Sequence, residues 1–107
     1  MAEVKQLYKD AFAAFARGDL DAAVEGYRRA VETDPGFALA WQGLAEVYGR
    51  QDRLDEAIEA IGKAIEADPA ESLYHTGLSR FLQRQGKIPE AEAAAMEAQR
   101  VQSRGPA

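Results

Sequence analysis

The chain has 107 residues, of which 47% are hydrophobic and 29% are charged, and its formal net charge is -5. This size and composition predict one folded domain at residues 1–107 and exclude a disordered or fibrous protein. The acidic balance disfavours nucleic-acid binding, which needs a basic face, and the absence of cysteine excludes disulfides, iron–sulfur clusters and thiolate zinc sites.

The sequence predicts six helices and no strand. At the N-terminus, MAEVKQ lacks a basic region followed by an apolar one, which favours a cytoplasmic protein. The longest apolar run, AFAAFA, is too short to cross a membrane. Apolar residues at helical spacing, separated by glycine, proline and polar breaks, predict helices at residues 3–17, 20–33, 37–50, 54–67, 71–84 and 88–102.

One pattern occurs twice, as LDAAVEGYRRAVETDP at residues 20–35 and as LDEAIEAIGKAIEADP at residues 54–69, with a spacing of 34 residues. The same spacing aligns small residues in all three thirds of the chain: Ala23 with Ala57 and Ala91, and Ala30 with Ala64 and Ala98. A period of this length is typical of stacked helical hairpins, each of which buries its apolar face only against its neighbours. The sequence therefore predicts an all-α superhelix, or solenoid, of three antiparallel helix hairpins.

The middle third carries a recognisable signature. Its residues read Trp41-x2-Leu44-Ala45-x2-Tyr48, followed by Ala57-x3-Ile61 and Pro69. This pattern resembles the tetratricopeptide repeat, with repeats at about residues 4–37, 38–71 and 72–105. The outer repeats depart from the pattern, with Leu7 and His75 in the tryptophan position, as is usual for the ends of a solenoid. The resemblance implies a right-handed superhelix whose first helices line a concave groove that binds segments of other proteins.

Catalysis and metal binding have little support in the sequence. His75 is the single histidine, and its place in the tryptophan column predicts a packed side chain, with pH sensing as the alternative. The acidic row Asp52, Asp55, Glu56 and Glu59 is expected to be a solvated helix face, because a straight helix does not wrap carboxylates around an ion. We therefore expect no enzyme activity, no cofactor and no metal site.

The resemblance also assigns residues to the groove. By position, these are Lys5, Tyr8, Lys9, Phe12, Leu39, Gln42, Glu46, Arg50, Leu73, Thr76, Arg80 and Arg84, together with Phe15, Gly43 and Gly77. Tyr8, Phe12 and Phe15 are expected either to contact a ligand or to pack against the next repeat, the second being favoured for Tyr8 and Phe15. Gly43 and Gly77 weaken their helices, so they should admit either a ligand backbone or, more readily, a neighbouring helix.

The charges assigned to the groove are mostly basic. Lys5, Lys9, Arg50, Arg80 and Arg84 stand against Glu46 alone, which predicts an acidic segment or a C-terminal carboxylate as partner, the alternative being ordinary solvated charges. The carboxylate clamp of some family members is not matched. Its positions here hold Tyr8, Phe12, Gly43, Leu73 and Gly77.

The sequence therefore predicts a non-enzymatic adaptor that binds a peptide of a partner protein. In this interpretation Phe12, Leu39 and Leu73 make the apolar contacts, and Arg50, Arg80 and Arg84 recognise charge. The alternative is a self-associating scaffold, a homo-oligomer joined through uncapped solenoid ends, because the last helix presents alanines with Met96 and Val101 on a surface that no further helix covers.

Overall fold

A computed structural model describes residues 2–104 of the chain. It contains six helices and, in this range, no strand: α1 (Ala2–Ala16), α2 (Leu20–Thr33), α3 (Ala38–Arg50), α4 (Leu54–Ala67), α5 (Ser72–Arg84) and α6 (Ile88–Arg104). The six predicted helices are confirmed, and no boundary differs by more than two residues. Residue 105, with which the third predicted repeat ends, lies outside the described residues.

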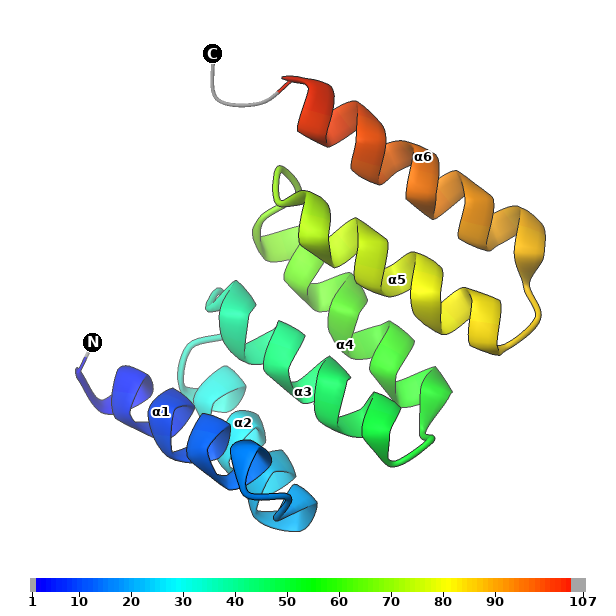
Figure 1. Ribbon diagram of the computed structural model, residues 1–107. Coiled ribbons are helices and arrows are strands. Elements are labelled where there is room, and N and C mark those ends of the chain that lie inside the picture. The colour runs from blue at the N-terminus through cyan, green and yellow to red at the C-terminus, as the bar shows by residue number, and fades with distance from the viewer. Residues whose placement is uncertain (1, 105–107) are drawn as a thin grey trace.

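The helices form three hairpins that stack in chain order. Within the hairpins α1 packs on α2, α3 on α4 and α5 on α6, while α2 packs on α3 and α4 on α5 between them. In Figure 1, α1, α3 and α5 lie side by side toward the viewer, α2 and α4 lie behind them, and α6 lies at one end. The predicted superhelix of antiparallel hairpins is confirmed. Within residues 2–104, no helix is both long and apolar enough to cross a membrane.

The three hairpin turns share one backbone geometry at a spacing of 34 residues. The turn residues Gly18, Asp52 and Gly86 have φ angles of 83°, 61° and 78°. In each turn an N–H donates to the carbonyl five residues earlier: Asp19 to Ala14, Arg53 to Tyr48 and Lys87 to Leu82, each at 2.9 Å. This is the Schellman arrangement, which requires a left-handed residue and favours glycine. Aspartate is one of the few other residues that adopt it readily, so Asp52 continues the series.

The core lies between the paired helices, where alanines alternate with bulky residues. Ala23, Ala57 and Ala91 are each at most 1% exposed, so the two helix axes of every hairpin approach closely. Tyr27 and Phe81 are almost completely buried and fill the space between successive hairpins, where they face Gly43 and Gly49 of α3. Burial raises the pKa of the Tyr27 hydroxyl to about 12, with a smaller contribution from the nearby Tyr8. The phenol therefore stays neutral at ordinary pH.

The third hairpin is held in part by a polar contact. Ser79 occupies the small-residue position of α5 and is 3% exposed, and its hydroxyl donates a hydrogen bond of 2.8 Å to the carbonyl of Ala91 in α6. A smaller apolar cluster of Leu82, Ala91 and Ala94 adjoins it and contacts Ile58 of the preceding hairpin. The hydrogen bond thus joins α5 and α6 within the third hairpin, while the side-chain packing attaches this hairpin to the second.

Candidate functional site

The surface formed by α1, α3 and α5 is the candidate site, and we call it the first-helix face. All twelve residues that the sequence predicts for the groove lie on these three helices, and none of them is buried. Nine are exposed: Lys5, Lys9, Phe12, Leu39, Arg50, Leu73, Thr76, Arg80 and Arg84. Tyr8, Gln42 and Glu46 are half-buried. The face is available for contact, and its assignment to a ligand stays a prediction.

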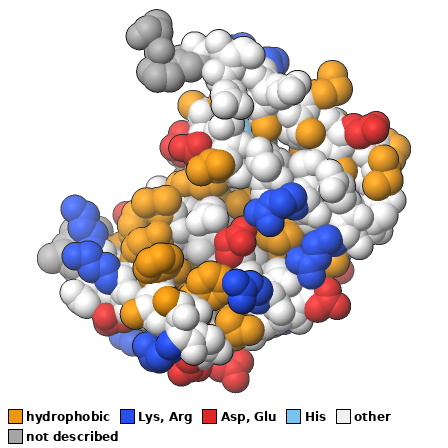
Figure 2. All heavy atoms as spheres, viewed as in Figure 1, with side chains coloured by type: hydrophobic (Ala, Val, Ile, Leu, Met, Phe, Trp, Pro, Cys, Tyr) orange, Lys and Arg blue, Asp and Glu red, His pale blue; other side chains and the backbone are white. Residues whose placement is uncertain are grey.

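Exposed apolar side chains are concentrated on this face. Phe12, Leu39 and Leu73 are 56%, 47% and 70% exposed, and the two other large apolar side chains exposed within residues 2–104 are Ile88 and Met96 of α6. Figure 2 shows hydrophobic side chains gathered over α1 and the first turns of α3 and α5. We call Phe12, Leu39 and Leu73 the apolar patch. Contiguous exposed apolar surface of this kind marks interaction sites.

The other two aromatic residues of α1 turn toward the protein. The Tyr8 ring lies 5.7 Å from that of Tyr27 and 5.4 Å from that of Phe37 at the start of α3. The guanidinium of Arg50 in α3 lies 5.0 Å from the centre of the Phe15 ring. Phe15 thus contacts the next repeat, as favoured from the sequence, whereas Tyr8 packs on α2 of its own repeat and on Phe37, the residue before α3. Phe12 stacks on Tyr8 and is 56% exposed.

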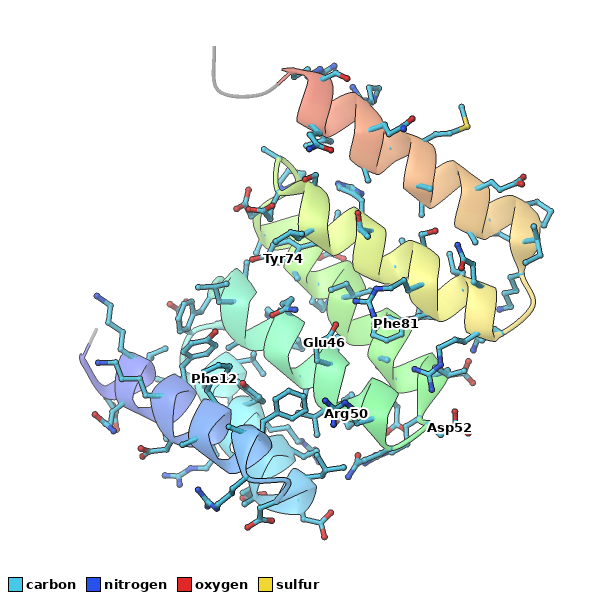
Figure 3. All side chains as sticks on the ribbon, viewed as in Figure 1. Phe12, Glu46, Arg50, Asp52, Tyr74 and Phe81 are labelled. Carbon is cyan, nitrogen blue, oxygen red and sulfur yellow. The ribbon has the colours of Figure 1, made fainter. Side chains whose placement is uncertain are left out.

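Two of the arginines form ion pairs between repeats. Arg80 in α5 lies 3.1 Å from the Glu46 carboxylate in α3, and Arg84 lies 3.1 Å from both Asp52 and the carbonyl of Gly49. We call Arg80–Glu46 and Arg84–Asp52 the cross-repeat ion pairs, and Figure 3 shows Glu46 on α3 and Asp52 in the turn that follows α3. Sequence reasoning missed Asp52 as a partner because it lies in a turn. The sequence did contain an indication of this pair, because Asp52 and Arg84 are separated by almost one repeat length.

The two lysines of α1 differ from these arginines. Lys5 and Lys9 are exposed, and neither forms an ion pair with any residue of the described range 2–104. They flank Tyr8, whose ring contacts Phe37, the residue that precedes α3. The first turn of α3 has neither an acidic residue nor a side-chain cap, so its helix dipole adds positive potential at the same place.

The two aligned glycines face a neighbouring helix rather than the solvent. Both are buried, and a Cβ atom at Gly43 would lie 2.5 Å from the Tyr27 ring of α2. A Cβ at Gly77 would lie 3.5 Å from Ile61 of α4. Of the two roles expected from the sequence, close helix packing is confirmed for Gly43. The assignment of these glycines to the ligand-contacting surface is wrong, because each faces the second helix of the preceding repeat.

His75 is buried, as the sequence predicts, and it occupies the place that tryptophan occupies one repeat earlier. The indole of Trp41 donates a hydrogen bond of 2.7 Å to the carbonyl of Pro35, and the His75 Nε2 lies 3.0 Å from the carbonyl of Pro69. Beside His75 lies a hollow of about 930 Å³ lined in part by Ile65 and Val101. The smaller imidazole leaves space that an indole would occupy.

We therefore expect His75→Trp to stabilise the protein. The larger ring would cover apolar surface of the hollow and would keep the bond to the Pro69 carbonyl, as Trp41 keeps its bond to Pro35. Filling such a space commonly raises the free energy of unfolding by about 0.5 to 2 kcal/mol. Urea unfolding followed by circular dichroism measures this change. His75→Ala, which enlarges the hollow and removes the contact with the Pro69 carbonyl, should shift the midpoint in the opposite direction.

All four carboxylates of the acidic row, Asp52, Asp55, Glu56 and Glu59, are exposed, as expected for a solvated face, and three of them also contact polar neighbours. Asp52 pairs with Arg84, Asp55 accepts a 2.6 Å hydrogen bond from Gln85, and Glu56 pairs with Arg53. The hydrogen bond from Arg53 lowers the pKa of Glu56. Within residues 2–104, no group of three or more histidine, aspartate or glutamate side chains is arranged to hold a metal ion.

Comparison with known proteins gives one family match. A sequence model described as tetratricopeptide repeat matches residues 14–80, which is more than half of the chain. None of the curated proteins matches the chain in sequence.

Several solved structures share the fold. MamA superposes with a TM-score of 0.92 at 24% identity, over 94% of this chain and 59% of MamA. SycD, the type III secretion translocator chaperone of Yersinia enterocolitica, gives 0.92 at 22% identity, over 99% of this chain and 80% of its own. The second repeat domain of Spaghetti, bound to the HSP90 peptide SRMEEVD, gives 0.87 at 21% identity, over 92% and 91%. The chain thus spans somewhat more than half the length of MamA and most of the other two.

Proposed function

The chain belongs to the tetratricopeptide repeat family, and from this premise we propose that it is a non-enzymatic protein-interaction module that holds a peptide segment of a partner on its first-helix face. The observation that carries the proposal is the apolar patch. Three of the five large apolar side chains exposed within residues 2–104 lie on this one face. The second repeat domain of Spaghetti, which has the same fold, is bound to a peptide.

Burial of the apolar patch would supply much of the binding free energy. Removing apolar surface from water contributes roughly 25 cal/mol per Å², and an aromatic ring at the centre of an interface often contributes most. Phe12 is suited to this role because its ring stacks on that of Tyr8, with the two planes inclined by 8°. A supported ring loses little side-chain freedom on binding.

The proposal of a non-enzymatic role is supported by how the single histidine is used. The His75 side chain is 7% exposed, and its Nε2 is engaged with the Pro69 carbonyl. A general base must reach a proton of the substrate, which a ring held in this way does poorly. Proteins of this family typically act as scaffolds or chaperones, which agrees with a binding role.

The test is a selection of short peptides on the wild-type protein, followed by titration of variants by fluorescence anisotropy. Phe12→Asp combined with Leu73→Asp should weaken binding of the selected peptides by more than about tenfold, equivalent to about 1.4 kcal/mol. The matched control is Ile88→Asp with Met96→Asp, which changes two exposed apolar residues of α6 in the same way. Equal binding by the wild type and the Phe12/Leu73 variant would contradict the proposal.

Self-association is the second candidate function, because Met96 on α6 is 69% exposed. The outer side of α6 favours it less, since Glu92 and Gln99 occupy the positions that Ile58 and Ile65 hold in α4. A further repeat or a second copy would have to bury these polar groups. Light scattering at increasing protein concentration decides between the two, because a protein that stays monomeric is not a scaffold of this kind.

A further inference from the structure

The free positive charge of the first-helix face is concentrated next to Phe12. Resting on the proposed function, we infer that the partner segment carries acidic residues beside its apolar ones, and that these carboxylates bind Lys5 and Lys9. Arg80 and Arg84 instead hold neighbouring repeats together. This division of roles differs from the sequence-based expectation, in which the arginines recognise the charge of the ligand.

Arg80 and Arg84 already have acceptors in the preceding repeat. Glu46 is only half-buried but accepts from Arg80 at 3.1 Å, and Arg84 has two acceptors at the same distance, Asp52 and the Gly49 carbonyl. Each arginine already has a carboxylate beside it, so a partner carboxylate would meet a partly neutralised charge and would gain less free energy there than at an unpaired cation. The Arg80–Glu46 salt bridge also connects α3 with α5, and Figure 3 shows Glu46 on α3.

Lys5 and Lys9 have no ion-pair partner among residues 2–104. Lys5 and Lys9 are four residues apart on α1, and like charges at this spacing repel and weaken the helix by a few tenths of a kcal/mol. Of the acidic residues nearest in sequence, Glu3 forms no ion pair with either lysine within residues 2–104, and Asp10 accepts a hydrogen bond of 2.8 Å from Gln6. A carboxylate placed between the lysines would relieve this repulsion. The positive potential at the start of α3 acts in the same direction.

The lysines of α1 lie beside the apolar patch. Lys9 and Phe12 are separated by three positions, so their side chains are neighbours on one side of α1. A segment that covers Phe12 therefore brings its flanking residues over Lys9 and Lys5. Acidic residues at these flanks would speed association and exclude basic segments, while the apolar contacts supply most of the affinity.

On the first-helix face as the structure describes it, Arg50 is the remaining cation that no salt bridge uses. It lies at the last residue of α3, three turns from Leu39, and its guanidinium covers the Phe15 ring. Its position at the far end of α3 separates it from the exposed part of the patch. We therefore assign charge recognition to the lysines of α1, and the experiment includes Arg50 as a competing site.

The probe is the set of peptides selected on the wild-type protein from a random library, together with analogues in which glutamine replaces each acidic residue. We expect aspartate or glutamate to be enriched beside large apolar residues. Replacing them with glutamine should weaken binding about tenfold, and Lys5→Glu with Lys9→Glu should weaken binding of the acidic peptides by at least as much. The Lys5→Glu, Lys9→Glu variant should also bind peptide analogues that carry lysine in place of their acidic residues more tightly than the wild type does.

Lys63→Glu with Lys87→Glu is the matched control, because it makes the same charge change at exposed residues outside the first-helix face. It should leave peptide affinity within about twofold of the wild type at moderate salt, since distant surface charges are screened. Circular dichroism verifies that both double variants remain helical.

The outcomes separate this inference from the proposed function. If no peptide binds the wild type, the proposed function fails. If peptides bind through Phe12 and Leu73 but their glutamine analogues bind equally well, the function stands and the inference is wrong. If Arg50→Glu abolishes the preference for acidic peptides and the lysine variant does not, charge is recognised at the other end of α3 and the inference is again wrong.

Discussion

Replacing Phe81 with alanine is expected to lower the free energy of unfolding by about 3 to 5 kcal/mol, the usual range for removing a buried phenylalanine. The Phe81 side chain is 1% exposed and lies against α3, where Gly49 makes room for it: a Cβ at Gly49 would lie 2.7 Å from the ring. The truncation leaves a cavity that the backbone of α3 is poorly placed to fill. Guanidinium unfolding followed by circular dichroism measures the loss.

Phe12→Ala provides the matched control, since it removes the same side chain from an exposed position on the first-helix face. It should change the free energy of unfolding by no more than about 0.5 kcal/mol. Phe81→Leu should fall between the two, because it keeps most of the apolar volume. A loss below about 1 kcal/mol for Phe81→Ala would show that Phe81 does not hold α5 against α3.

The fold was predictable because one local pattern is repeated at a fixed spacing. Each hairpin buries its stripe only against its neighbours, so the spacing of 34 residues determined the number of hairpins and their order. The turn residues at positions 18, 52 and 86 follow the same period, although one of them is aspartate. At these positions the turn preference of the residue and the repeat spacing both predict the end of a helix, so the helix boundaries could be predicted closely.

The pairing of charges was not predictable in the same way. Glu46 and Arg80 occupy the same position of successive repeats, so alignment alone indicates that they are close. Whether two exposed long side chains then form an ion pair depends on their rotamers and on competing neighbours such as Asp52. The apolar patch, in contrast, followed from the register of α1, α3 and α5, since each of its members lies on the outward side of a helix.

The aligned glycines were open to two interpretations because the residue that each one faces belongs to another helix. Gly43 faces a tyrosine and Gly77 faces an isoleucine at equivalent positions of α2 and α4. The sequence contains both pairs at the spacing of one repeat. Only the structure shows how much space remains in each, and this difference gives the two glycines opposite expected responses to the same substitution.

Gly43→Ala is expected to lower the free energy of unfolding by about 1 to 3 kcal/mol, although alanine is the better helix former. The new methyl group would lie 2.5 Å from two carbons of the Tyr27 ring, which is 2% exposed and has little room to move. Gly77→Ala should instead raise the free energy of unfolding by up to about 1 kcal/mol. Its methyl group meets Ile61 at an ordinary 3.5 Å, so the gain in helix propensity remains.

A double-mutant cycle tests the cause. In the Tyr27→Ile background, α2 presents the same side chain to α3 that α4 presents to α5, so Gly43→Ala should become neutral or stabilising. Tyr27→Ile alone is destabilising because it removes volume from the core, and the coupling between the two sites should therefore be favourable. If Gly43→Ala is equally destabilising in both backgrounds, the Tyr27 ring is not what requires glycine at this position.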